Sequence, residues 1–582
     1  MLAGPLLTRE AITAPRHPKL FLIRAGYLAA FVVLMYTAGQ ATFERRPVQT
    51  LGDSASFGRF LFDLFAMVQL TLASAAALLF SSSVVSQEKD KRTLVLLLMT
   101  DLTNFELVAG KLAASLLLVV MLIGVSLPVF ALLAILGGIS AAQVFWAEAL
   151  CLSTAALVGS WSTLVAYWRD KTFQTLAICV IGGLLFVGVV EGISAIGGSS
   201  LAETLNPYRA MANVLDPLGS QPLMVSPVPT ALWPVLVSCS LASVLGLVTM
   251  VMVRVWNPSR FAFDQMAEPT AEERSAAVAL DLAPATNAKR ENREIWNLPV
   301  LWREVCTRAY GRKMIFVKLA YFVLAGFIVF NLSQSYDSQQ IILGMMSPVG
   351  FAFASLSLVS LILVNAQAVT SLTSERDAQT LELLLVTNVT AKEFVFGKLG
   401  GIFFNAKEVI LVPMFLLIAL ALRGEFSLES TLYVLVGYLV LVAFSAMVGL
   451  HAGLSYGQSR AAIGNSLGTV FFLFVGIFVC MMLIVEARSS FALQLTPFLV
   501  FILGGSLGLW ASLSHKNPSP ALMMASALLP FLTFYAITGY LLGGTLGVSL
   551  SVVAAYGFTT LAMLVPAVSA FDVAIGRSAV DK

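Results

Sequence analysis

Long apolar stretches alternate with short polar segments along the whole chain. Fourteen of these stretches reach the length of about 20 residues that a helix needs to cross the hydrocarbon core of a bilayer. They are about twice as long as membrane strands and lack alternation of polar and apolar residues, so the pattern predicts helices. The predicted spans are 20–38, 61–85, 112–136, 144–167, 174–196, 231–254, 314–331, 345–372, 399–422, 430–456, 462–485, 492–513, 520–543 and 547–571.

Composition agrees with this pattern. Of the 582 residues, 58% are hydrophobic and only 12% are charged, whereas soluble proteins carry about 25% charged residues. The polar surface that a soluble enzyme, a disordered chain or a disulfide scaffold needs is missing. We therefore expect an all-α polytopic membrane protein with about 12–14 transmembrane helices.

Lysine and arginine predict how the helices are oriented. Short loops rich in these residues stay on the cytoplasmic side of a membrane. Lys89, Lys91 and Arg92 lie between the second and third predicted spans, whereas the loops on the other side hold few cations, among them Arg45 and Arg46. No short apolar core with a cleavage site precedes the first span, so we expect no removable signal peptide. The pattern predicts that both termini are cytoplasmic.

The five cysteines form no CxxC pair, and four of them lie within apolar stretches. We expect all five to be unpaired thiols that act as small hydrophobic side chains.

The chain contains an internal repeat. Residues 88–112 align with residues 375–399 without a gap, and 14 of the 25 positions are identical. The segment that begins at Pro5 also matches the segment that begins at Pro299. Because the matched loop follows the second span in each copy, the copies are parallel repeats of a roughly six-helix bundle. We expect repeats at 1–255 and 299–582, a cytoplasmic linker at 256–298, and an extra hairpin near 492–543 in the second repeat.

The repeated loop has two local signals. Leu94, Leu97 and Leu98 recur at helical spacing beside charged residues, which predicts a short amphipathic helix. Thr103-x-x-Glu106 and Thr390-x-x-Glu393 have the spacing of a capping box, which predicts a helix start at each. Such loops can simply lie on the lipid surface. Their duplication favours a docking surface for a partner with two-fold symmetry.

The repeated pattern E-x-D-x-x-T-L-x-L-L-L-x-T, followed by Thr, Glu and Gly-Lys-Leu, resembles the permease subunits of type-2 ATP-binding-cassette (ABC) exporters. The resemblance covers both halves to about residue 485. It implies an elbow helix before the first span of each half, and coupling segments at 86–105 and 373–392 that contact the ATPase. The implied coupling residues are Glu88, Asp90, Thr93, Glu106, Glu375, Asp377, Thr380 and Glu393. The implied elbow residues are Arg9, Glu10, Arg303 and Glu304.

The resemblance also implies a partner that hydrolyses ATP. Gly110-Lys111 and Gly397-Lys398 are followed by Leu, so neither forms a phosphate-binding loop, and the chain has no other enzyme motif. Its three histidines lack the spacing of metal ligands. We expect no cofactor or metal in this chain and no nucleic-acid partner. Two copies of a cytoplasmic P-loop ABC ATPase would bind ATP and Mg²⁺, with the chain integral to a bacterial cytoplasmic membrane. Family permeases commonly have six spans and pair as dimers, whereas this chain holds both copies.

Charged residues inside predicted spans are candidates for a transport pathway because they are costly in a bilayer. The charged residues within spans are Asp63, Glu148, Glu191, Lys407 and Glu408, and we select Glu191, Lys407 and Glu408 as pathway candidates. Asp63 lies near the outer end of its span. Lys407 can instead extend its side chain to the cytoplasmic interface, because it lies close to the start of its apolar stretch.

The favoured hypothesis is therefore the membrane subunit of an ATP-driven exporter. Charge reversal at Glu88 together with Glu375 is expected to uncouple ATP hydrolysis from transport. The alternative is a secondary transporter or channel driven by an ion gradient, and a membrane anchor for a cytoplasmic complex is a third possibility. Apolar spans suit a lipid, a drug-like amphiphile or a lipid-linked polymer as substrate, and the sequence does not choose among them.

Overall fold

The computed structural model describes most of the chain. The described residues are Thr8, Ile12, 18–43, 50–197, 200–216, 231–257, Trp296, 298–306, 314–335, 346–381, 389–487, 491–515 and 518–574. The predicted elbow residues Arg9 and Glu10, most of the predicted linker, and residues 382–388 of the second predicted coupling segment lie outside them.

The described residues form an all-helical protein. Its first part contains α2 (Pro18–Phe43), α3 (Leu51–Asp90), α4 (Thr93–Leu98), α5 (Asn104–Leu136), α6 (Ala141–Trp168), α7 (Thr172–Gly197), α8 (Ser200–Leu205), α9 (Pro207–Leu215) and α10 (Leu232–Trp256). Its second part contains α13 (Pro299–Cys306), α14 (Met314–Ser335), α15 (Pro348–Asp377), α17 (Ala391–Leu422), α18 (Leu428–Ser455), α19 (Ser459–Ala487), α20 (Phe491–Leu513), α21 (Pro520–Leu541) and α22 (Leu546–Ala574).

Each of the fourteen predicted spans falls on one long helix, so the prediction of a helical membrane protein is confirmed. Within the described residues, thirteen helices are long and apolar enough to cross a membrane, while the apolar part of α20 is the shorter stretch Phe498–Leu513. Several predicted starts were too late. α3 begins at Leu51 instead of 61 because Thr50 and Asp53 form a capping box ahead of the apolar residues.

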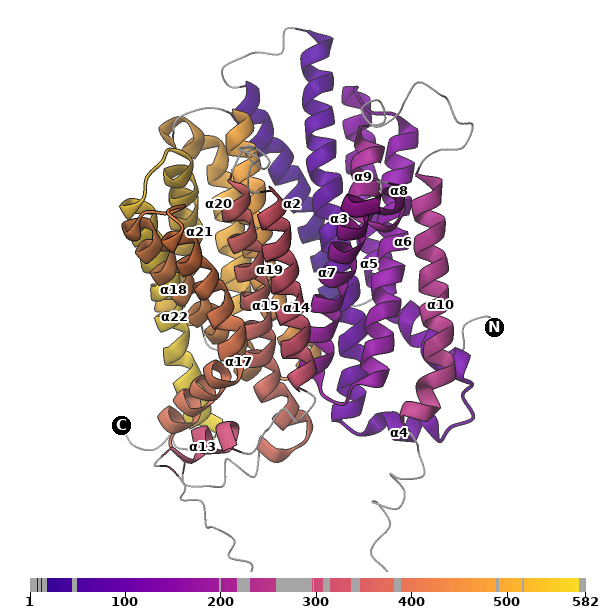
Figure 1. Cartoon of the computed structure of the whole chain (residues 1–582), viewed down its shortest axis with the longest axis vertical. Coiled ribbons are helices and arrows are strands. Elements are labelled where there is room, and N and C mark those ends of the chain that lie inside the picture. Colours follow the sequence, from indigo (N-terminus) through magenta and orange to yellow (C-terminus); the bar gives the residue numbers. More distant parts are fainter. Residues whose placement is uncertain are drawn as a thin grey trace, which may run out of the picture.

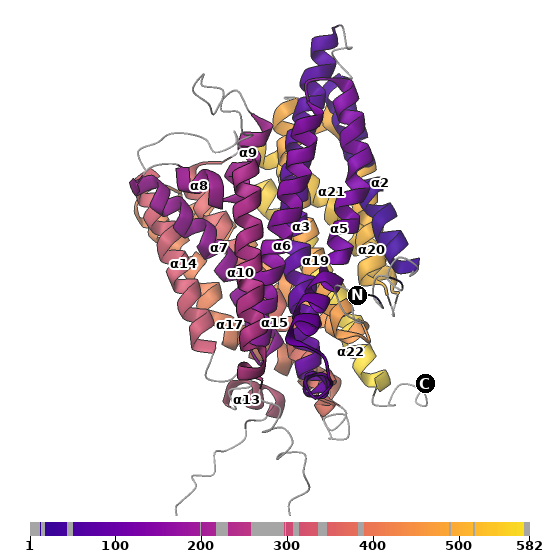
Figure 2. The same ribbon diagram turned by 90° about the vertical axis from the view of Figure 1, so that its right-hand side faces the viewer.

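The long helices stand side by side in two groups (Figure 1). In the first group α3 packs against α5, α6 and α7, and α6 packs against α10. In the second group α15 packs against α17, α18 and α19, α18 packs against α22, and α21 packs against both α20 and α22. The short helices α4 and α13 lie at the lower end of the molecule, whereas α8 and α9 lie in its upper half (Figures 1 and 2).

Two seams join the groups. At one seam α7 packs against α14, where the Phe327 ring lies against Gly188 and Gly192. A Cβ atom at either glycine would be 2.9 Å from that ring, so a larger residue at either position would push the ring away. At the other seam α2 packs against α20 and α19. In addition, α3 contacts α19 and α15 contacts α7 across the middle of the molecule.

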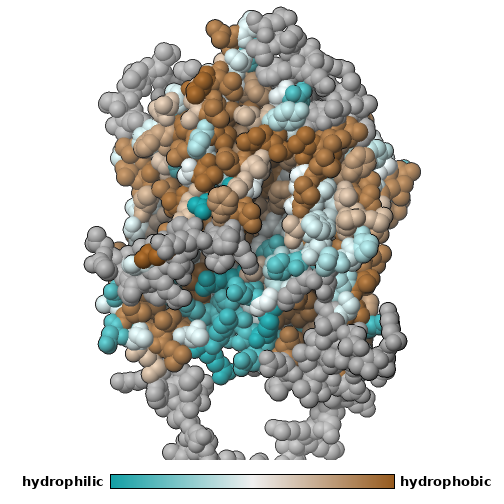
Figure 3. All heavy atoms as spheres, turned by 180° about the vertical axis from the view of Figure 1, so that it is seen from behind, coloured by the Kyte–Doolittle hydropathy of each residue, from teal (hydrophilic) through white to brown (hydrophobic). Residues whose placement is uncertain are grey.

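The outer surface is largely apolar. Leu247, Val251 and Val255 of α10 and Ile315 and Leu319 of α14 are among the exposed large hydrophobic side chains. Figure 3 shows hydrophilic residues gathered toward the lower end of one face, below a mainly hydrophobic surface. This distribution is what a bilayer requires, since lipid-facing side chains must be apolar. The chain is thus a polytopic all-α membrane protein.

All five cysteines are free, as the sequence predicted. Cys151, Cys179 and Cys480 are buried among the helices. They fill space as small hydrophobic side chains.

The contact between α15 and α18 depends on a glycine. A Cβ atom at Gly449 would lie 2.6 Å from Cβ of Ala368 and 2.7 Å from the carbonyl oxygen of Asn365. We expect Gly449→Ala to lower the free energy of unfolding by about 1–3 kcal/mol, because the two helix backbones must move apart. Unfolding in mixed detergent micelles measures this change. Gly437→Ala on the same helix is the control, since a Cβ atom at Gly437 would be 3.9 Å from its nearest neighbour, Cγ1 of Val552. Equal losses in both variants would contradict the prediction.

Candidate functional site at the lower ends of α3 and α15

Helices α3 and α15 end in the same local conformation at matched positions of the repeated segment. α3 ends at Asp90 and α15 ends at Asp377. Shortly after each end lies a residue with positive φ, Arg92 at 58° and Gln379 at 57°. The next residue is a threonine in both cases, and its hydroxyl donates back to the carbonyl oxygen five residues earlier, at 3.3 Å for Thr93 and 3.1 Å for Thr380. Each helix is therefore stopped and turned in the same way.

The left-handed backbone conformation of Arg92 and Gln379 costs free energy, and substitutions can test this. A side chain in this region of backbone space costs about 1–2 kcal/mol, and glycine avoids the cost. We expect Gln379→Gly to raise the free energy of unfolding by about 0.5–1 kcal/mol, with Arg92→Gly acting in the same direction. Thermal unfolding in detergent measures the change. Lys91→Gly is the control because Lys91 has φ of −80°, and it should give no gain. A gain from Lys91→Gly equal to that from Gln379→Gly would argue against the backbone explanation.

The predicted amphipathic helix is present after α3. In α4, Leu94 and Leu98 are buried, while Leu96 is 59% exposed. Arg254 of α10 holds the end of this segment, because its guanidinium donates to the side chain of Asn104 at 2.7 Å and to the Leu102 carbonyl at 3.2 Å. α4 is thus fixed to the bundle and presents an apolar outer face.

Both predicted capping boxes are confirmed. Thr103 Oγ1 accepts from the Glu106 backbone N–H at 3.2 Å, and Glu106 accepts from the Thr103 N–H at 3.0 Å. Thr390 and Glu393 make the equivalent bonds at 3.3 and 3.0 Å. α5 and α17 consequently begin at Asn104 and Ala391, as the capping boxes predicted, about two turns before the apolar spans that start at 112 and 399. The polar first turn is helical because its free N–H groups have partners.

The carboxylates of Glu88 and Glu375 point into the protein, toward the lysine of the matched Gly-Lys pair. Glu88 forms an ion pair with Lys111, and Glu375 forms one with Lys398 at 2.8 Å. Lys398 also pairs with Glu304 at 2.7 Å, and its side chain is only 1% exposed. Each glutamate therefore ties the end of one helix to the beginning of the next.

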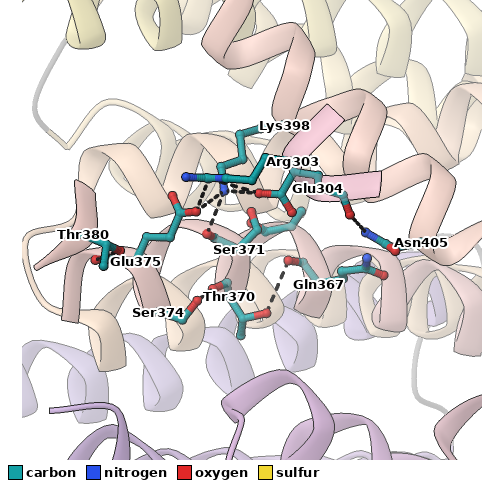
Figure 4. A network of polar contacts seen from close by, with 11 residues as sticks. Arg303, Glu304, Gln367, Thr370, Ser371, Ser374, Glu375, Thr380, Lys398 and Asn405 are labelled. Carbon is teal, nitrogen blue, oxygen red and sulfur yellow. Dashed lines mark hydrogen bonds and ion pairs between the residues drawn. The ribbon is translucent and has the colours of Figure 1, made fainter. Parts of the chain in front are cut away.

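Arg303 joins the second of these ion pairs to α13 (Figure 4). Its guanidinium contacts the Glu375 carboxylate directly and lies 3.3 Å from Glu304. α13 can approach α17 closely because a Cβ atom at Gly401 would lie 2.5 Å from Cβ of Glu304. Hence α13, the predicted second elbow, and the end of α15, the predicted coupling segment, share one charge network.

The cations next to the matched aspartates were missed by the sequence analysis. Lys89 of α3 donates to the carbonyl oxygens of Tyr167 at 2.5 Å and Arg169 at 2.9 Å, at the end of α6. The side chain of Arg376 on α15 likewise donates to carbonyl oxygens at the end of α18, those of Gly453 at 3.0 Å and Tyr456 at 2.5 Å. These carbonyls have no partner within their own helix, and a cation stabilises the negative end of the helix dipole. The Lys–Arg pair in the ungapped alignment was a signal that could have indicated this role.

Arg169, between α6 and α7, brings another cation to this end of the molecule. Its guanidinium carbon lies 3.4 Å from the ring centroid of Trp168. Desolvation lowers the pKa of Arg169, and the neighbouring Asp170 opposes that shift. Arginine remains protonated near neutral pH, so the positive charge is retained.

Asp90 and Asp377 come together at the boundary between the two helix groups. Both line one narrow polar crevice, whose other residues include Gln87, Thr172, Ser459 and Arg460. Asp90 accepts a hydrogen bond from Thr172 at the start of α7. The crevice takes residues from α3, α7, α15 and α19, so both helix ends lie at the contact between the groups.

The three predicted pathway residues have separate partners. Glu191 pairs with Arg209 and accepts from Asn206, both at 2.5 Å. Glu408 pairs with Lys318 at 2.8 Å, whereas the Lys407 ammonium lies 4.1 Å from the ring centroid of Phe404. Their role in a pathway stays a prediction.

Within the part of the chain that the structure describes, no group of three or more His, Cys, Asp or Glu side chains could hold a metal ion. A scan against protein-family models finds no match to the chain, and a search of curated proteins finds no similar sequence. Function must therefore be argued from the repeated segments and their geometry.

Proposed function

We propose that this chain is the transmembrane permease subunit of an ATP-driven ABC exporter, with ATP hydrolysis on a separate subunit. The observation that carries the proposal is the pair of helix ends at Asp90 and Asp377. Both have the same turn, the same inward glutamate–lysine ion pair and the same following capping box. Two equivalent helix ends, both beside the boundary between the helix groups, suit a partner that binds and moves both ends together.

The proposal includes two parallel repeats of one bundle. When the ungapped register of the repeated segment is carried forward, the ends of α6 and α18 coincide, as do the starts of α7 and α19. Packing follows the same correspondence, since α10 lies on α6 as α22 lies on α18. The hairpin α20–α21 then has no counterpart in the first repeat. Its position supports the extra hairpin expected near 492–543.

The lower end of the molecule is the proposed cytoplasmic face. It carries Lys89, Arg169 and Arg376, as expected for loops that stay in the cytoplasm. Leu96 of α4 is 59% exposed, Met99 at the end of α4 is 48% exposed, and Phe105 at the start of α5 is 51% exposed. Exposed apolar side chains with polar residues around them are typical of a docking surface.

In the proposed mechanism, two ATPase subunits dock on the segments after α3 and α15. Their closure on ATP pulls both helix ends, and the crevice that Asp90 and Asp377 share transmits the movement to the boundary between the repeats. ATP shifts the balance between two packings of the repeats because the closed ATPase pair binds one packing more tightly. Arg303 makes α13 move with the end of α15.

Affinity purification from native membranes in mild detergent tests the proposal. We expect about two copies of a P-loop ATPase per chain, which would support the exporter and its two repeats together. Purification without an ATPase, even after crosslinking in the presence of ATP, would favour the transporter driven by an ion gradient. Attention would then turn to Glu191, Lys407 and Glu408.

A further inference from the structure

A buried carboxyl group lies inside the first helix group, away from the lower end. Glu148 of α6 is 8% exposed and lies seven residues from the helix start, about 10 Å at the helical rise. Its neighbours along α6 include Ala147, Leu150 and Cys151, which belong to the main hydrophobic core. Ionised carboxylates are rarely placed in such surroundings without a cation.

The polar groups that reach Glu148 are neutral. Nε2 of Gln69 on α3 donates to Oε2 at 2.7 Å, and Oγ of Ser126 on α5 lies 3.1 Å from Oε1. The nearby titratable groups are Tyr27 of α2 and Cys151 of α6, and both are neutral near pH 7.

The cations on the helices around α6 have other partners. Arg209 of α9 pairs with Glu191 of α7, and Arg254 of α10 bonds to Asn104. On α3, Arg59 pairs with Asp216. The other charged residue in that part of α3, Asp63, is acidic and cannot neutralise Glu148. None of the ion pairs found among the described residues includes Glu148.

The hydrogen bonds of the Ser126 hydroxyl group indicate whether Glu148 carries a proton. Oγ of Ser126 donates to the carbonyl oxygen of Ile123 at 2.6 Å. Oγ of Ser126 is also within donor range of Glu148 Oε1, at 3.1 Å, but a hydroxyl has a single hydrogen and the Ile123 carbonyl is the closer acceptor. With a proton on Oε1, Glu148 donates to Ser126 and still accepts from Gln69 on Oε2.

We propose that Glu148, Gln69 and Ser126 form a proton-binding site in the first helix group, with the proton held on Glu148 Oε1 near neutral pH. The ligand is the proton itself, and no metal is needed. The three side chains come from α3, α5 and α6 of this chain, and none of them is a proposed contact of the ATPase.

The second helix group offers an internal comparison. In the register of the repeated segment, Leu356, Pro413 and Leu435 stand at the positions of Gln69, Ser126 and Glu148. The equivalent place in the second group is therefore apolar. This comparison uses the proposed repeat, whereas the contacts at Glu148 do not depend on it.

Infrared spectroscopy of the whole chain, labelled with ¹³C-carboxyl glutamate and held in detergent at neutral pH, tests the site. We expect the difference spectrum, obtained by subtracting the Glu148→Gln spectrum from the wild-type spectrum, to show a positive carbonyl band of a protonated carboxylic acid. Glu191→Gln is the matched control, because Glu191 pairs with Arg209 and its loss should leave that band unchanged. A wild-type protein without the band, or a Glu148→Gln variant that keeps it in full, would overturn the proposal.

Ser126→Ala is the second variant, for use if Glu148→Gln does not fold. It removes the acceptor of the carboxyl hydrogen, so the protonated-acid band should shift to higher frequency. An ionised Glu148 absorbs elsewhere, so a spectrum unchanged in this region would contradict the proposal. Neither measurement involves an ATPase, and the result is therefore separate from the outcome for the exporter.

Discussion

Replacing Lys398 with methionine is expected to lower the free energy of unfolding by about 3–5 kcal/mol. The side chain of Lys398 is 1% exposed and pairs with Glu304 and Glu375, which are 4% and 18% exposed. Without the ammonium group, two carboxylates share a buried place with only Arg303, whose side chain is 37% exposed. Unfolding of the purified chain in mixed micelles, followed by circular dichroism, measures the loss.

Lys392→Met is the matched control for that experiment. Lys392 is an exposed lysine near the start of the same helix, so its replacement should change stability by less than about 0.5 kcal/mol. Adding Glu304→Gln to Lys398→Met should recover part of the loss, because one of the uncompensated charges is removed. Equal effects of the two lysine variants would show that the buried network is not what stabilises this end.

The double variant Leu96→Asp, Met99→Asp is expected to lower the recovery of the proposed ATPase from about two copies to about one copy per chain, because it alters only the docking segment after α3. Truncation of central apolar contacts typically costs about 2–4 kcal/mol of binding energy, which corresponds to about a 30- to 1,000-fold loss of affinity. Both side chains are about half exposed or more, so folding should be preserved. Quantitative mass spectrometry of the purified complex measures the ratio of ATPase to permease.

These exposed residues give a cleaner test than Glu88 and Glu375. The glutamates pair with Lys111 and Lys398, so charge reversal would disturb helix packing together with any partner contact. Leu51→Asp is the control, because Leu51 is 91% exposed at the opposite end of α3. Normal ATPase recovery with the α4 double variant, or equal loss with Leu51→Asp, would remove α4 as the docking surface.

Local signals in the sequence predicted much of this structure. The lengths of the apolar stretches predicted the fourteen long helices, because a membrane span is specified by a run of about 20 apolar residues. Thr103 with Glu106, and Thr390 with Glu393, predicted two helix starts because a capping box involves only residues three apart. α4 was predicted from the spacing of its leucines.

The positions of the turns after α3 and α15 were harder to predict from the sequence. Arg92 and Gln379 have positive φ although neither is glycine, and the usual signal for a left-handed residue was therefore absent. Lys89 was treated as a charge of a basic loop and Arg376 was not singled out, whereas they bond to the ends of α6 and α18. Such bonds join residues that are far apart in the chain.

The sequence by itself determined that this is a helical membrane protein, where its long helices lie and how two of them begin. Only the tertiary structure decided which face of each helix is buried, because a uniformly apolar helix has no apolar stripe that marks its packing face. It also decided the partners of the few charges, which pair Glu88 with Lys111, join Arg303 to Glu375, and leave Glu148 with Gln69 and Ser126. Charges are scarce inside this protein, so their partners follow from how the helices pack.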